Sequence, residues 1–194
     1  MDEFTYDDLV DGLRTVIARI QHTELRGATI QIVGGAALRL IHFERSATVD
    51  VDARIVPADE IESIADVLAS ERGWSSGWLN HNAAQFVPAW GRSIEWVTLF
   101  ADASVTVQVA PVDALLAMKL LAAAGRPGRD TDDILQLLRL NDVRSVEEAE
   151  AIFEAFYPGD SLSDRVHQLV ERAFTIGLPV QKPSPPRPDL QPEH

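Results

Sequence analysis

The sequence contains no cysteine, which excludes disulfide bonds, thiolate metal sites and a cysteine nucleophile. It has no run of about eighteen apolar residues that could span a bilayer, so we expect no membrane partner. Basic residues are also few: 17 Lys and Arg stand against 30 Asp and Glu, giving a formal net charge of −13. This charge argues against a general nucleic-acid coat, whose sequence-independent affinity depends on basic surface. A local basic patch on an acidic protein remains compatible with that total.

Several catalytic motifs are also missing. The chain has no Gly-x-Ser-x-Gly and no His-Glu-x-x-His, and its five histidines show no metal-ligand spacing, which argues against a hydrolase. Without Gly-x-Gly-x-x-Gly there is no dinucleotide-binding fingerprint. The first residues are acidic where a secretory signal would be basic and then apolar. We therefore expect a cytoplasmic protein.

The most informative stretch covers residues 32–55 and reads IVGGAALRLIHFERSATVDVDARI. Gly34 and Gly35 end a short apolar strand, and fourteen residues separate this pair from Asp50. Asp50 and Asp52 alternate with apolar residues. Successive side chains of a strand point to opposite faces, so both carboxylates project from one face. Proteins hold Mg²⁺ by one or two carboxylates together with substrate phosphates, and glycine lets phosphate oxygens approach the backbone. This stretch therefore predicts a metal and phosphate site.

A second block covers residues 117–133 and reads AMKLLAAAGRPGRDTDD. It places Lys119 in an apolar helix, where the side chain either extends to solvent or contacts a phosphate. Asp130 stands where it can cap the next helix, with Asp133 three residues further on in the capping-box position. Capping alone accounts for both acids, but a residue can both cap a helix and take part in catalysis.

At these residues the sequence resembles the DNA polymerase β-like nucleotidyltransferase superfamily, in which a Gly-Gly turn is followed by Asp-x-Asp. The fuller pattern, GGAALRL followed by R-x-x-T-x-D-V-D, looks like the bacterial branch that contains AbiEii-type and MenT-type toxins. The block from residue 117 to 133 is similar to the downstream Lys and Arg-Asp-x-x-Asp motif of that branch. The two blocks together cover under a quarter of the chain.

The resemblance implies a nucleotidyltransferase that uses a nucleoside triphosphate, releases pyrophosphate and depends on Mg²⁺ or Mn²⁺. It implies metal binding by Asp50 and Asp52, catalytic roles for Asp50, Asp52, Lys119 and Asp130, and nucleotide binding by Gly34, Gly35, Arg45, Thr48 and Asp133. It also implies a toxin that adds nucleotides to the 3′ end of tRNA and blocks translation, with a cognate antitoxin as partner. A phosphorylated Thr48 would crowd the two metal-binding carboxylates.

Two alternatives stay open on these residues. The first is a nucleotidyltransferase that modifies a protein or an aminoglycoside, and the net charge of −13 suits a cationic drug better than tRNA. The second is a catalytically silent binding partner of the same fold, which would need the glycine pair for structure but not both aspartates.

The patterns predict an α/β (α+β) fold, with a small mixed sheet flanked by helices and a mostly helical C-terminal lobe. We expect a nucleotidyltransferase core over residues 1–110, a helical lobe over 111–178, and a proline-rich disordered or extended tail over 179–194 that buries no core. Hydrophobic periodicity predicts helices over 5–22, 36–41, 59–68, 112–124, 145–156 and 163–176, and strands over 29–33, 48–55, 85–90, 94–100 and 105–109. Residues 73–84 are expected to form a loop, and Glu95 is the only candidate for a third carboxylate within a predicted strand.

Overall fold

The computed structural model describes residues 3–44, 48–125, 128 and 130–192. It has a mixed α/β fold, as the sequence predicts, with a five-stranded sheet and flanking helices. The chain divides into two compact units. Unit 1 comprises residues 1–84, 96–110 and 183–194, and unit 2 comprises residues 85–95 and 111–182.

Unit 1 is built on a mixed sheet whose strand order is β3-β2-β1-β5-β4. The strands are β1 (Ala28–Ile32), β2 (Val51–Val56), β3 (Leu79–Asn80), β4 (Val97–Ala101) and β5 (Val105–Val109). The central strand β1 runs antiparallel to β2 and parallel to β5, while β4 runs antiparallel to β5. Val105, Val107 and Val109 are buried while the residues between them are half-buried, so one sheet face forms the core and the other is polar.

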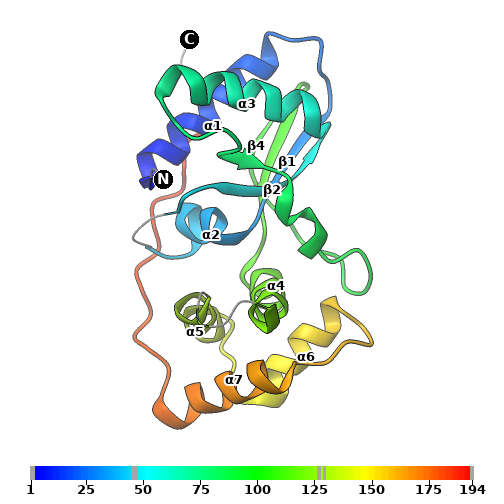
Figure 1. The fold of residues 1–194 in the computed structure, drawn as a ribbon, viewed down its shortest axis with the longest axis vertical. Helices are drawn as coiled ribbons and strands as arrows, with labels where there is room; N and C mark the ends of the chain where they lie inside the picture. The colour runs from blue at the N-terminus through cyan, green and yellow to red at the C-terminus, as the bar shows by residue number, and fades with distance from the viewer. Residues whose placement is uncertain (1–2, 45–47, 126–127, 129, 193–194) are drawn as a thin grey trace. The chain divides into compact units, whose positions relative to one another are not determined.

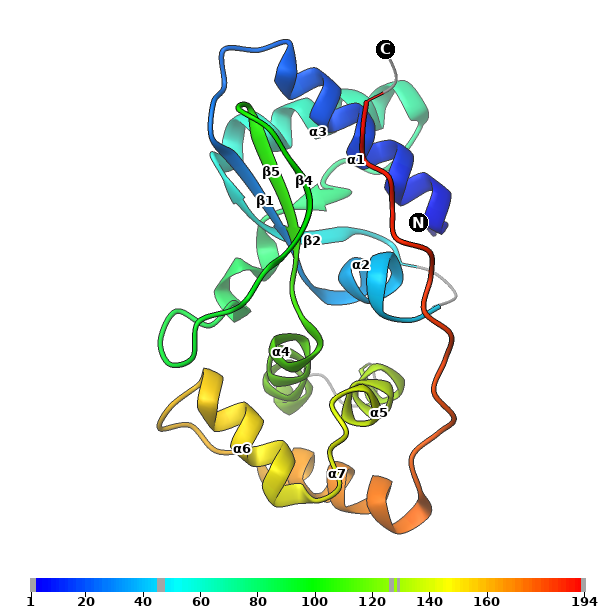
Figure 2. The same ribbon diagram turned by 180° about the vertical axis from the view of Figure 1, so that it is seen from behind.

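Two amphipathic helices contribute a large part of the unit 1 core. Helix α1 (Tyr6–Gln21) begins at a capping box in which Thr5 and Asp8 bond each other's backbone amides, and α3 (Ala58–Arg72) ends at Gly73 in the left-handed conformation. Both helices lie on the same side of the sheet (Figure 2). The buried Trp78 indole donates to the Ala65 carbonyl at 2.9 Å, which fixes the segment after α3 against that helix.

The proline-rich C-terminal segment returns to unit 1 as an extended strap, seen in red in Figure 2. Its polar contacts include the Glu44 amide donating to the Pro183 carbonyl at 2.8 Å, and the Ser184 hydroxyl donating to the His42 carbonyl at 3.1 Å. Leu190 is only 1% exposed. The expectation that this tail buries no core is therefore wrong, because a leucine within it is almost fully buried.

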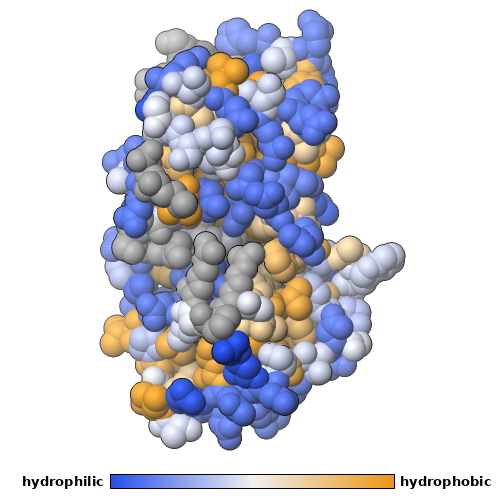
Figure 3. All heavy atoms as spheres, viewed as in Figure 1, coloured by the Kyte–Doolittle hydropathy of each residue, from blue (hydrophilic) through white to orange (hydrophobic). Residues whose placement is uncertain are grey.

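Unit 2 is helical and contains α4 (Val112–Gly125), α5 (Thr131–Leu140), α6 (Val146–Phe156) and α7 (Asp164–Ile176), shown in Figure 1. Ser145 and Ser163 cap α6 and α7 through their hydroxyls. Residues 85–95 join this unit through Arg92, whose guanidinium lies 4.3 Å from the Phe156 ring centroid and pairs with Asp113. On the face drawn in Figure 3, apolar side chains of unit 2 lie among hydrophilic ones.

Most predicted elements are confirmed, but three predictions need correction. Residues 85–90 do not form a strand: a 3-10 helix covers Asn82–Phe86, and residues 87–96 have no strand. The expected loop over 73–84 contains the short strand β3, paired in parallel with β2. Strand β2 begins at Val51 rather than at residue 48, and Thr48 makes only an isolated bridge to Phe4. Among the described residues, none of the helices is both long and apolar enough for a membrane span.

His42 is expected to make the stability of unit 1 depend on pH. Burial lowers the pKa of this histidine, although its Nε2 lies 2.8 Å from the Ala110 carbonyl, a contact that opposes the shift. An unfolded histidine titrates near pH 6.5, so the unfolded chain takes up this proton at a higher pH than the folded chain. We therefore expect stability to fall as the pH drops below about 6.5.

Urea unfolding at pH 7.5 and 5.5 checks this expectation. The pH-dependent loss of unfolding free energy should be smaller in His42→Gln than in the unaltered chain. Replacement of the exposed His22 by glutamine provides the matched control and should leave the loss unchanged. An equal loss in His42→Gln and the unaltered chain contradicts the assignment.

Candidate functional site

The glycine turn and Asp52 meet at the end of β1. The chain leaves β1 through the extended Val33 and turns at Gly34, whose φ of +64° lies in the left-handed region that favours glycine. A Cβ built on Gly34 would lie 3.1 Å from Asp52 Oδ2 and 3.6 Å from Asp52 Cβ. The Asp52 carboxylate therefore lies against the backbone of the turn. A side chain at position 34 would strain the backbone and crowd this carboxylate.

The backbone around Asp52 is fixed by its strand partners. The Asp52 carbonyl accepts the Val33 amide at 2.9 Å, and Asp52 pairs with Asn80 across β2 and β3. Asn80 in turn accepts the Asn82 amide at 3.0 Å. The glycine turn is followed by α2 (Gly34–Ala37) and a π-helical turn, Leu38–His42. The predicted short helix is thus present but is α-helical only in its first part.

Of the other predicted residues of the first block, the structure describes Gly35, Thr48 and Asp50. Asp50 lies just before β2, and its carbonyl accepts the Thr48 hydroxyl at 3.0 Å. Thr48 is buried and bridged to Phe4, so its hydroxyl is engaged by backbone rather than turned to solvent. Gly35 occupies the second position of α2. Arg45 lies outside the residues that the structure describes.

The second block forms a buried ion cluster in unit 2. Lys119 on α4 places its Nζ 2.5 Å from Asp130 Oδ1 and 3.0 Å from Asp133 Oδ2, and the three side chains are 12%, 8% and 7% exposed, respectively. Asp130 holds the N-cap position of α5 but makes no capping bond. The capping explanation for Asp130 is therefore wrong, because its carboxylate binds the lysine instead.

The structure thus groups the predicted residues within each unit. Gly34 and Asp52 meet in unit 1, and Lys119, Asp130 and Asp133 meet in unit 2. Glu95 precedes β4 and is exposed. Within the described part of the chain, no group of three or more His, Cys, Asp or Glu side chains could hold a metal ion. A hard cation at Asp50 and Asp52 would therefore need further oxygen ligands from a substrate.

A chain of polar side chains, not predicted from the sequence, crosses the sheet on the face that carries Asp52. Arg54 Nε donates to Gln31 Oε1 at 2.7 Å, Gln31 Nε2 donates to Gln108 Oε1 at 2.8 Å, and Gln108 Nε2 donates to Thr98 Oγ1 at 3.3 Å. We call these four residues the polar ladder. A signal was present, because polar residues alternate with apolar ones in both β1 and β5.

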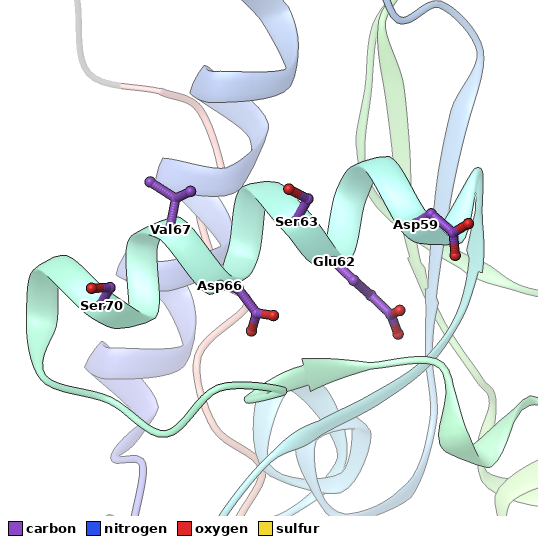
Figure 4. A pocket seen from close by; sticks show the side chains of 6 residues that line it. All are labelled: Asp59, Glu62, Ser63, Asp66, Val67 and Ser70. Atoms are coloured by element: carbon purple, nitrogen blue, oxygen red, sulfur yellow. The ribbon is translucent and has the colours of Figure 1, made fainter.

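An open depression on α3 has a structural explanation. It is lined by Asp59, Glu62, Ser63, Asp66, Val67 and Ser70, all on one helix (Figure 4). Glu62 accepts the His81 amide at 2.7 Å, and Asp66 accepts the Gly77 amide at 2.8 Å. Two of its acids therefore hold the segment that leads into and out of β3.

No family model, curated protein or solved structure matches this chain.

Proposed function

We propose that this protein is a Mg²⁺-dependent nucleotidyltransferase that joins a nucleotide from a nucleoside triphosphate to the 3′ end of tRNA. The observation that carries the proposal is the Asp52 carboxylate lying against the left-handed Gly34 turn. A carboxylate, the kind of side chain that binds Mg²⁺, thus lies beside a stretch of backbone that has no side chain at its first residue, and this supports the proposal. The resemblance of the two sequence blocks to AbiEii-type and MenT-type toxins supports the choice of reaction and acceptor.

The donor set suits a hard divalent cation. Asp50 and Asp52 are two residues apart, and oxygen ligands of this kind, completed by substrate phosphates, are what Mg²⁺ prefers. When bound, the cation neutralises charge on the triphosphate and favours ionisation of the acceptor hydroxyl. The chain itself orients Asp52 through the Val33 and Asn80 pairings and keeps position 34 free of a side chain.

The reaction is a displacement at phosphorus. The 3′ hydroxyl oxygen of the acceptor forms a bond to the α-phosphorus, and the bond from that phosphorus to the bridging oxygen breaks. Pyrophosphate leaves with the bonding electrons, and the hydroxyl proton passes to solvent. Such transfers depend mainly on positioning and on charge neutralisation, so the protein needs few chemical groups of its own.

The cellular role that we propose is that of the toxin in a cytoplasmic toxin-antitoxin pair. Adding nucleotides to the 3′ end of tRNA prevents aminoacylation, and a cognate antitoxin would restrain the activity. The alternative acceptors are a protein and an aminoglycoside. The net charge of −13 favours the aminoglycoside, which is cationic. The following assay separates these acceptors.

The test incubates the full chain with Mg²⁺, total tRNA and each α-³²P-labelled nucleoside triphosphate in turn. We expect label in the tRNA band, and we expect EDTA to abolish it. Label on a protein band, or on an added aminoglycoside, would move the proposal to that acceptor. Absence of transfer to all three acceptors with every triphosphate contradicts the proposed function.

A further inference from the structure

Arg54 stands at one end of the polar ladder with part of its guanidinium unused. Its Nε is bound by Gln31, which is itself buried and uses its amide NH₂ group to hold Gln108. Within the described residues, its two terminal NH₂ groups have no hydrogen-bond partner, and no carboxylate pairs with the side chain, which is exposed. This is notable in a chain of net charge −13. The ladder therefore orients an arginine edge whose geometry matches two phosphate oxygens.

An aromatic ring lies beside this edge. Arg54 Cζ is 5.9 Å from the centroid of the Trp96 ring, and the tryptophan is half-buried. An arginine above a tryptophan ring is held by the ring's negative face. The same kind of ring also stacks nucleic-acid bases, because every base has a π-face of its own. Two adjacent side chains can therefore bind the two parts of a nucleotide: Arg54 suits the phosphate and Trp96 suits the base.

Arg54 also shares a sheet face with Asp52. The two residues are separated by Ala53 in β2, whose side chain is buried on the opposite face. Side chains two residues apart along a strand are about 7 Å apart. A nucleotide held by Arg54 would therefore lie next to the carboxylate to which we assign the metal.

We propose that Arg54 and Trp96 form a nucleotide-binding subsite, with a phosphate on the guanidinium and a base on the indole ring. The inference rests on the proposed function, because it names a ligand of the same sheet face. Two sources carry this chemistry: the nucleoside triphosphate and the terminal nucleotide of a single-stranded RNA acceptor. Gln31 is a positioning residue, because it acts through Arg54.

The test measures binding without turnover. Fluorescence anisotropy with a labelled single-stranded RNA, and separately with a labelled nucleoside triphosphate, compares the full chain with Arg54→Gln and Trp96→Leu. We expect both substitutions to weaken binding of the same probe, either the RNA or the nucleoside triphosphate, by about tenfold. Arg26→Gln and Trp90→Leu, which change an exposed arginine and an exposed tryptophan elsewhere, should bind as the unaltered chain does. The affected probe identifies the source of the nucleotide.

A structural role is separated from stacking by Trp96→Phe. This variant keeps an aromatic face and should recover most of the affinity lost in Trp96→Leu, while the quenching of tryptophan emission by the ligand should disappear. Quenching should persist in Trp90→Phe. Unchanged affinity for both probes in Arg54→Gln and Trp96→Leu overturns the subsite, as does failure of the unaltered chain to bind either probe.

The two proposals fail in different ways. Binding that depends on Arg54 and Trp96 without any transfer of label would contradict the nucleotidyltransferase and leave the subsite in place. Transfer of label with unchanged affinity in every variant would contradict the subsite and leave the nucleotidyltransferase in place.

Discussion

Asp52→Asn is expected to reduce nucleotide transfer by at least about a thousandfold while leaving the fold intact. Asparagine has nearly the shape of aspartate, so it fits against the Gly34 turn, where Asp52 Oδ2 lies 3.1 Å from the point that a Cβ at position 34 would occupy. Asparagine carries no charge, however, so it binds a divalent cation much more weakly than the carboxylate that would hold Mg²⁺ together with the triphosphate. The measurement is the rate of label transfer to tRNA at saturating Mg²⁺.

The control for this substitution is Asp59→Asn, which removes an exposed acid from α3 in the same unit. It should transfer label at the unaltered rate. Circular dichroism and the urea midpoint of both variants should match those of the unaltered chain. If Asp52→Asn transfers label at a rate within tenfold of the unaltered chain, Asp52 is not a metal ligand, because the proposed metal binding depends on the negative charge of this carboxylate.

Local patterns predicted the parts of unit 1 on which Asp52 depends. Strand β5 was predicted with its observed bounds, because its valines alternate with polar residues in a strand that is buried on one face only. The paired glycine at the end of an apolar strand predicted the turn, and Gly34 does take a positive φ. The same alternation predicts that Asp52 projects from the face opposite the buried Ala53, whereas its closeness to the Gly34 turn is seen only in the structure.

The failed predictions involve contacts between distant residues. Residues 85–90 look like a strand, but the Phe86 carbonyl accepts the Tyr157 hydroxyl and the Arg92 amide bonds the Ala155 carbonyl, so the segment packs on α6. Strand β3 has only two residues and exists through its pairing with β2. Neither partner can be found from local periodicity.

The candidate site shows the same division. Spacing alone brought Asp130 and Asp133 to the start of α5, but it could not show that both would bind Lys119 in preference to capping the helix. The polar ladder was equally hidden, because its members come from four strands. Only the register of the sheet places Gln31 opposite both Arg54 and Gln108.

Lys119→Met is expected to lower the free energy of unfolding by about 3–5 kcal/mol, the usual loss when one partner of a buried ion pair is removed. The lysine ammonium lies between Asp130 and Asp133, and all three side chains are at most 12% exposed. Methionine fills a similar volume but leaves two carboxylates without their shared cation, in a place that water reaches poorly. Urea unfolding at pH 7.5 measures the loss.

A triple variant separates the lost charge from lost packing. Lys119→Met combined with Asp130→Asn and Asp133→Asn removes the ammonium and both carboxylates together, so it should regain most of the stability that Lys119→Met loses. A loss below about 1 kcal/mol in the single variant would mean that the cluster contributes no more than an exposed ion pair. Because this readout is stability in the absence of nucleotide, it does not depend on whether Lys119 also contacts a phosphate during turnover.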